Sequence, residues 1–140
     1  MLTMRIPACP VMLPAALALA LVLSGCASIV RKSPMVCNTG ECMIPVEVVD
    51  CAITAPDIEV QGASRNLFWI LDPHSSYKFA SNGIAIANND GEFSGPGLNG
   101  SRKQFHWFDA NTKANPTPYK YTVTIEGCAT PLDPSIVNRG

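Results

Sequence analysis

Alternating apolar and polar residues, turn-forming residues about every ten positions and the lack of a helical stripe predict an all-β fold, a small antiparallel β-sandwich. The clearest segment is residues 119–126, in which apolar and polar side chains occupy opposite faces of a strand. Its apolar face consists of Tyr119, Tyr121, Val123 and Ile125. We expect that face to be buried and the other to contact water.

Residues 66–71 form a nearly continuous apolar run, which predicts a central strand covered on both faces. Shorter strands are expected around the pairs Val46/Val48, Ile58/Val60, Tyr77/Phe79, Ile84/Ile86 and Phe105/Trp107. Turn residues separate these segments: Asp72-Pro73, Ser81–Gly83, Asn88–Gly91, Ser94–Gly97 and Asn115–Pro118. The region from Gly83 to Gln104 is rich in glycine, and within it we expect a long exposed loop over residues 88–104 that either binds a partner or has no role.

Two resemblances concern this β-rich region. The order Cys51, Trp69, Cys128 resembles the Cys-Trp-Cys core of immunoglobulin domains, although Glu126 stands where that family has a tyrosine two residues before the second cysteine. Most of residues 46–138 is similar to small uncharacterised bacterial β-rich domains, and the matching segments are Trp69, Tyr77–Phe79, Gly83-Ile84, Phe105–Trp107, Asp109–Asn111, Tyr119–Val123 and Leu132–Asn138. That likeness implies a fold and no activity.

The N-terminal residues have the pattern of an export signal. Arg5 supplies a positive charge, and residues 11–23 form an apolar run of thirteen residues, shorter than the roughly 20 residues that span a bilayer as a helix. The next motif, Leu23-Ser24-Gly25-Cys26, resembles the lipobox of bacterial lipoproteins. That resemblance implies cleavage after Gly25 and acyl chains, including palmitate, on Cys26, which would anchor the protein to a lipid bilayer.

The lipobox resemblance gives a domain plan: a signal peptide at 1–25, a lipidated tether at 26–45 and a β-sandwich domain at 46–140. In lipoproteins an aspartate after the lipidated cysteine marks inner-membrane retention; here Ala27 follows, so we expect the periplasmic face of the outer membrane. An uncleaved anchor or an ordinary secretory signal is the alternative. Met4 fits the role of initiator methionine as well as Met1 does.

Four cysteines remain once Cys9 leaves with the signal and Cys26 is lipidated. An even number in an oxidising compartment predicts two disulfides, with three pairings open. Because Asn38 and Gly40 favour a turn, we favour a local bridge between Cys37 and Cys42, which leaves Cys51 for Cys128. The alternative is a copper(I) site that uses these two sulfurs with the flanking Met35 and Met43.

The remaining residues argue against several function classes. Removing Arg5 leaves 9 basic and 11 acidic residues, and the basic pairs Arg31-Lys32 and Arg102-Lys103 are expected to be solvated, so no nucleic-acid footprint is predicted. No hydrolase elbow, zinc-protease helix or phosphate-binding loop occurs. The stretch Asn88–Glu92 offers oxygens to calcium but lacks the spacing of a calcium loop, so a hairpin turn is expected.

An enzyme would require His74 or His106 to meet a carboxylate such as Asp72 or Asp109. We instead expect a non-enzymatic binding or envelope-assembly module without a cofactor. Its expected partners are the bilayer, through Cys26, and an envelope protein.

Overall fold

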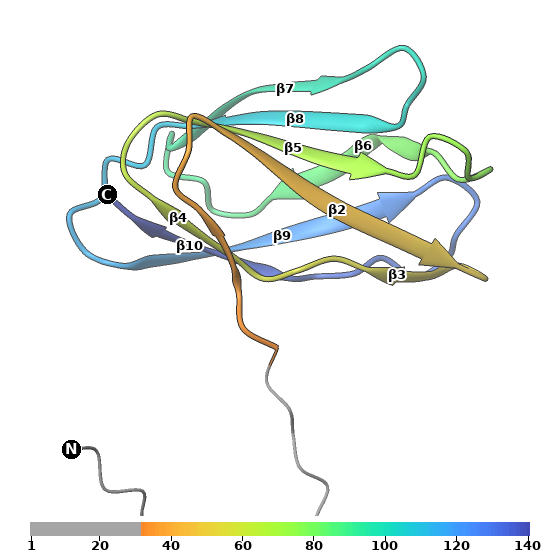
Figure 1. Ribbon diagram of the computed structural model, residues 1–140, viewed down its shortest axis with the longest axis horizontal. Helices are drawn as coiled ribbons and strands as arrows, with labels where there is room; N and C mark the ends of the chain where they lie inside the picture. The colour runs from red at the N-terminus through yellow and green to blue at the C-terminus, as the bar shows by residue number, and fades with distance from the viewer. Residues whose placement is uncertain (1–31) are drawn as a thin grey trace, which may run out of the picture. The chain divides into compact units, whose positions relative to one another are not determined.

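The computed structural model describes residues 32–140, which form one compact unit of ten strands and no helix (Figure 1). The strands are β1 Met35–Cys37, β2 Glu41–Val49, β3 Ala52–Thr54, β4 Ile58–Gln61, β5 Arg65–Leu71, β6 Phe79–Ile86, β7 Phe93–Leu98, β8 Gln104–Asp109, β9 Thr117–Ile125 and β10 Ser135–Arg139. They make two five-stranded sheets around one apolar core, which confirms the predicted all-β sandwich. In this part of the chain no helix is long and apolar enough to cross a membrane.

The two sheets differ from the prediction in strand direction. The first sheet has the order β1-β4-β10-β9-β6 and the second β3-β2-β5-β8-β7. The pairs β1–β4, β4–β10 and β2–β5 are parallel, and the other five pairs are antiparallel. Each sheet is therefore mixed. In the first sheet β4 lies between two parallel neighbours, β1 and β10, and in the second sheet β2 runs parallel to β5.

The predicted tether at 26–45 is wrong for its second half, because β1 and the start of β2 belong to the sandwich. In β2 the side chains of Cys42, Ile44 and Val46 are buried between polar or exposed positions. Cysteine and proline make this alternation less apparent in the sequence than the alternation of residues 119–126. Pro45 is tolerated because β3 pairs only with residues 47–49 of β2. The missing N–H of Pro45 therefore costs no hydrogen bond to β3. Residues 26–31 of the tether lie outside the described part.

The core joins aromatic residues from both sheets. Trp69 of the second sheet is fully buried and its ring lies 5.4 Å from that of Tyr121 in the first sheet. Tyr119, Tyr121, Val123 and Ile125 are buried as predicted, while Lys120 and Glu126 are exposed. Burial of each large apolar side chain contributes roughly 1.5–3 kcal/mol. Residues 66–71 do form the central strand β5, but its outward Phe68 and Ile70 are only half-buried, so the predicted cover on both faces is wrong.

The region between Gly83 and Gln104 does not contain the long loop predicted over residues 88–104, because a strand lies within those residues. Gly83 lies inside β6, where an added Cβ would stand 2.7 Å from the Phe79 Cβ, so only glycine fits. Residues 93–98 form the edge strand β7, and the pairing with β8 shifts register between Ser94 and Gly97. Pro96 sits in that irregular stretch of an edge strand, the position where a sheet accommodates proline.

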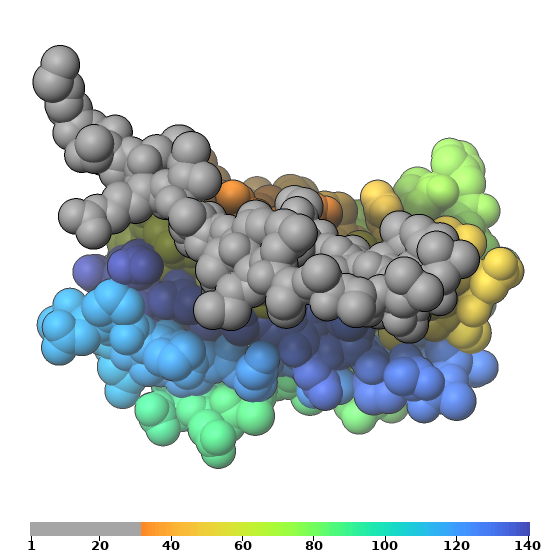
Figure 2. Space-filling view, turned by 90° about the horizontal axis from the view of Figure 1, so that it is seen from below, coloured from red at the N-terminus to blue at the C-terminus, as the bar shows by residue number. Residues whose placement is uncertain are grey.

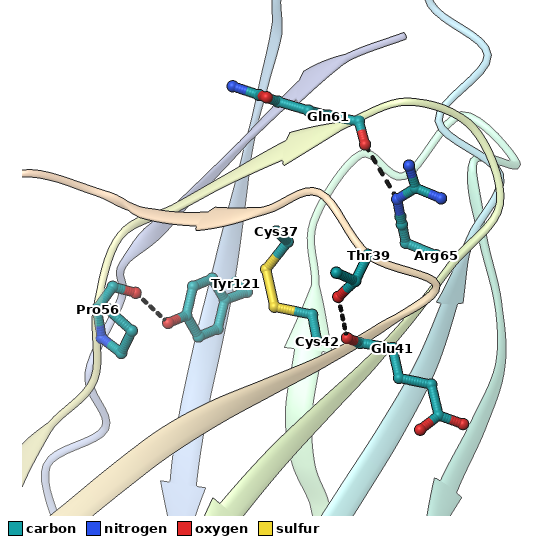
Figure 3. Close-up of a disulfide and its surroundings, with 8 residues drawn as sticks. All are labelled: Cys37, Thr39, Glu41, Cys42, Pro56, Gln61, Arg65 and Tyr121. Carbon is teal, nitrogen blue, oxygen red and sulfur yellow. Dashed lines mark hydrogen bonds between the residues drawn. A yellow bond between two sulfur atoms is a disulfide. The ribbon is translucent and has the colours of Figure 1, made fainter.

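Both predicted disulfides are present. The Cys37–Cys42 bond is buried at the turn by which the chain passes from the first sheet to the second, beside Tyr121 (Figure 3). The Cys51–Cys128 bond joins the turn after β2 to the segment that follows β9. Figure 2 shows the gold, green and blue segments that follow β2, β5 and β9 at the same end. Cys51 is exposed while Trp69 is buried, so this bond does not form the central Cys-Trp-Cys core of the immunoglobulin resemblance.

Replacing Cys51 and Cys128 together with alanine should lower the free energy of unfolding by about 4 kcal/mol, since the bond closes a loop across 77 positions. The Cys37/Cys42 double alanine variant is the matched comparison. Its loop spans only 5 positions, so the entropic loss is about 2 kcal/mol, with a further cost for the cavity left in the core. Urea unfolding of the oxidised proteins measures both. Equal stability of the Cys51/Cys128 variant and the wild type would contradict the loop-closure argument.

Candidate functional site

The histidines do not form the acid–base pairs that an enzyme of this sequence would need. His74 donates its backbone N–H to Asp72 Oδ1 at 2.9 Å, which makes a turn. The His106 ring contacts Gly95 O at 3.2 Å and Asn66 Oδ1 at 3.1 Å. Within residues 32–140 neither ring makes a hydrogen bond or an ion pair with a carboxylate.

The four residues of the copper alternative do not offer a thiolate site. Cys37 and Cys42 are joined to each other, so neither sulfur is free to bind a metal. Met35 lies in the first sheet and Met43 in the second. Across residues 32–140 no group of three or more His, Cys, Asp or Glu side chains is placed to hold a metal ion. The calcium candidate at 88–92 is a turn, in which Asn89 Oδ1 accepts from Gly91 N–H at 2.7 Å.

The pair Arg102-Lys103 is structural, whereas the sequence predicted a solvated patch. Arg102 donates from Nε and Nη2 to the carbonyl of Phe79, at 3.1 and 2.8 Å. Lys103 Nζ donates to the carbonyls of Ser75 and Tyr77 and to the Ser75 hydroxyl. Both cations therefore tie the hairpin between β7 and β8 to residues 75–79, which lead from the end of β5 into β6.

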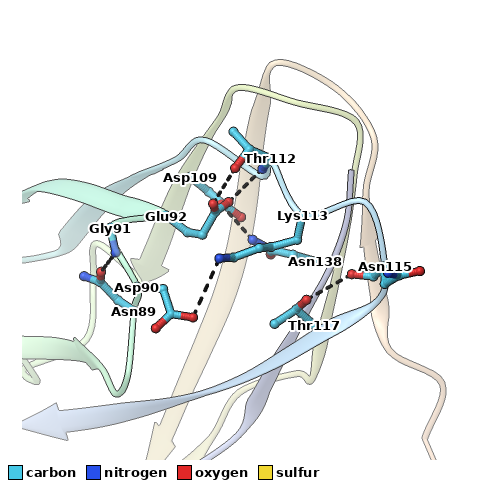
Figure 4. A network of polar contacts seen from close by, with 10 residues as sticks. All are labelled: Asn89, Asp90, Gly91, Glu92, Asp109, Thr112, Lys113, Asn115, Thr117 and Asn138. Carbon is cyan, nitrogen blue, oxygen red and sulfur yellow. Dashed lines mark hydrogen bonds and ion pairs between the residues drawn. The ribbon is translucent and has the colours of Figure 1, made fainter.

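A polar cluster closes the end of the sandwich opposite the Cys51–Cys128 bond (Figures 1 and 4). Asp109 Oδ1 accepts from Asn138 Nδ2 and from the Asn111 N–H, both at 2.9 Å, and so links the two sheets. The Glu92 carboxylate accepts the Thr112 N–H at 2.7 Å and the Thr112 hydroxyl. Asp109, Asn111 and Asn138 are at most 1% exposed, so these hydrogen bonds are shielded from water.

Burial raises the pKa of Asp109 to about 6, against the two hydrogen bonds that favour its charged form, and the nearby Glu92 carboxylate adds to the rise. Burial also opposes ionisation of Glu92, yet the Thr112 hydrogen bonds hold its pKa below the ordinary value. Among the described residues Asp109 Oδ2 has no hydrogen-bond partner. This unpaired oxygen is consistent with the raised pKa, because the negative charge that ionisation would place on Oδ2 receives no hydrogen bond.

A surface groove lies between the diverging ends of β2 and β5 and is here called the β2–β5 groove. The parallel pairing of these strands runs from Glu41↔Asn66 to Val46↔Leu71 and then stops. β5 ends at Asp72-Pro73, whereas β2 continues to Val49 and turns its other side to β3. The groove has a volume of about 720 Å³ and is lined by residues 43, 45–49, 70–73 and 75.

The lining of the groove is mainly apolar and open to solvent. Val49 is 67% exposed and Met43 53% exposed, unusually high for large apolar side chains of a strand. Pro45 and Ile70 add apolar surface, because they are paired across the two strands on the outer face. A concave apolar surface with a few polar groups is the usual form of a binding site. We therefore take the groove as the candidate functional site; the sequence offered no signal for it beyond the apolar outer face of β5.

The chain was also compared with known proteins. It matches no protein-family model, and no curated protein resembles it significantly.

The raised pKa of Asp109 predicts an unusual pH dependence of stability. Between about pH 4 and pH 6 the folded protein keeps a proton on Asp109 that the unfolded chain has released. The free energy of unfolding should therefore fall by up to about 3 kcal/mol as the pH rises through that window, and stay lower above it. The Asp109→Asn variant keeps an acceptor oxygen and should not show this fall. Asp50→Asn, at an exposed turn, is the control and should follow the wild type. Urea unfolding from pH 4 to pH 8 measures all three. Parallel curves for wild type and Asp109→Asn would refute the assignment.

Proposed function

We propose that the protein is a lipoprotein held by acylated Cys26 at the periplasmic face of the outer membrane, where its sandwich binds a partner in envelope assembly. The anchor rests on the resemblance of Leu23–Cys26 to a lipobox, which lies outside the described residues. Residues 27–31 then join Cys26 to the folded unit, which starts at Lys32.

Two disulfides support a compartment outside the cytoplasm, because disulfides persist where the environment is oxidising. The Cys37–Cys42 bond lies in the apolar core at the crossover between the sheets, and the Cys51–Cys128 bond joins the turn after β2 to the segment after β9.

The observation that carries a binding role is the β2–β5 groove, with Met43 and Val49 half or more exposed. Apolar surface gathered in a hollow, rather than scattered singly, is typical of an interaction site. A binding module uses such a surface directly and needs no catalytic side chains. The proposed role therefore follows from the surface and not from a motif.

The anchor is tested by Cys26→Ser. We expect the variant to lose labelling by radioactive palmitate, to migrate differently on gels and to leave the membrane fraction, because two or three acyl chains are what hold the protein there. Cys9→Ser changes a cysteine within the expected signal and is the matched control. Unchanged labelling and fractionation of Cys26→Ser would rule out the lipid anchor.

The binding role is tested with a photo-crosslinking amino acid in place of Met43, inside the groove, or of Val36. Val36 is 48% exposed but lies on β1 in the other sheet. Irradiation of intact cells should give a discrete adduct from position 43 and none from position 36. Identical adduct patterns at both positions would contradict a specific site in the groove.

A further inference from the structure

The side of β2 that faces the groove has no strand partner in the described chain beyond Val46. There β5 has ended, and residues 47–49 pair only with β3 on the opposite side. A short length of strand edge is thus exposed inside a hollow instead of being covered. An exposed strand edge is a template for pairing with another extended chain.

The groove has the size and lining that suit a short extended peptide. Its volume of about 720 Å³ lies within the range of ligand sites and accommodates a few residues. Successive side chains of an extended peptide point to opposite faces, so every second side chain would face Met43, Val49 and Ile70. The other side chains would point to the opposite face of the sheet.

The charge of the rim selects among such peptides. Glu47 and Asp72 line the groove, and within residues 32–140 neither carboxylate forms an ion pair. Lys32 lines a smaller hollow beside Pro45 and Glu47, but it forms no ion pair with Glu47. The ammonium group of Lys103 is already used in three hydrogen bonds to Ser75 and Tyr77. The rim therefore has two carboxylates available to a basic ligand, and opposite charges across an interface favour encounter and register.

We propose that the β2–β5 groove binds an extended partner peptide, with alternating apolar side chains and flanking lysine or arginine, that adds a strand to the free side of β2. This deepens the binding role proposed above and rests on it for the partner's origin in the envelope. The peptide's backbone would pair with β2, its apolar side chains would cover Met43 and Val49, and its basic residues would face Glu47 and Asp72.

The same charges argue against two other occupants. All eleven acidic residues lie in 32–140, whereas only eight of the ten basic residues do, because Arg5 and Arg31 precede it. The described unit thus has a formal net charge of −3, which disfavours a second copy and an anionic bilayer at an acidic rim. A basic peptide is the occupant that this charge favours.

The test uses the mature lipoprotein extracted in detergent and a fluorescent synthetic peptide of alternating valine and threonine with a lysine at each end. We expect saturable binding by fluorescence anisotropy. Replacing the lysines with glutamates should weaken binding about tenfold or more, and N-methylation of alternate backbone nitrogens should abolish it. Binding that is indifferent to both changes would overturn strand addition at an acidic rim.

Protein variants locate the site. Val49→Asp should weaken binding of the lysine peptide at least about tenfold, and Glu47→Lys should weaken it while improving binding of the glutamate peptide. Val36→Asp makes the same change as Val49→Asp at an exposed valine outside the groove, and should bind like wild type. Circular dichroism and urea unfolding identify any variant that fails to fold, for which Val49→Thr replaces Val49→Asp.

Two results would assign the groove to another occupant and so overturn the proposal. One is a concentration-dependent dimer in sedimentation that Val49→Asp abolishes. The other is binding of Cys26→Ser protein to phosphatidylglycerol vesicles that Val49→Asp abolishes. Peptide binding is also measured with the Cys26→Ser protein, so a failed lipid anchor and a failed peptide site give different patterns of results.

Discussion

The central constraint on this structure is the passage of the chain from one sheet to the other between Cys37 and Cys42. The disulfide across that turn fixes β1 in the first sheet and β2 in the second. Because β2 then runs parallel to β5, it must enter the sheet beside the start of β5 and continue past its end. The groove and the exposed apolar side chains of β2 follow from this geometry, as does the free strand edge beyond Val46.

Much of the fold was accessible from periodicity. The alternation in residues 119–126 placed the correct side chains in the core, and cysteine counting with turn chemistry gave both disulfides. Where the prediction failed, residues of low strand propensity occupied strands. Pro45 and Pro96 lie in strands whose ladders are incomplete at those points, a condition that exists only once the neighbouring strands are known.

The site was less accessible, because it depends on contacts between distant segments. His106 and Asp109 are near neighbours in sequence, but an odd spacing in a strand places their side chains on opposite faces. Asp109 instead meets Asn138, 29 positions away, across the two sheets. The groove likewise arises where one strand stops and another continues. Local patterns cannot show this, since the ends of β2 and β5 are set by their other partners.

The position of β4 has a consequence for biogenesis. This strand lies between β1, near the start of the folded unit, and β10, at the chain's end, and pairs with both. The first sheet therefore cannot be completed until residue 139 is free to pair, and such long-range pairing slows folding. Until synthesis reaches that residue, only the second sheet, whose last strand ends at Asp109, has all of its strands available.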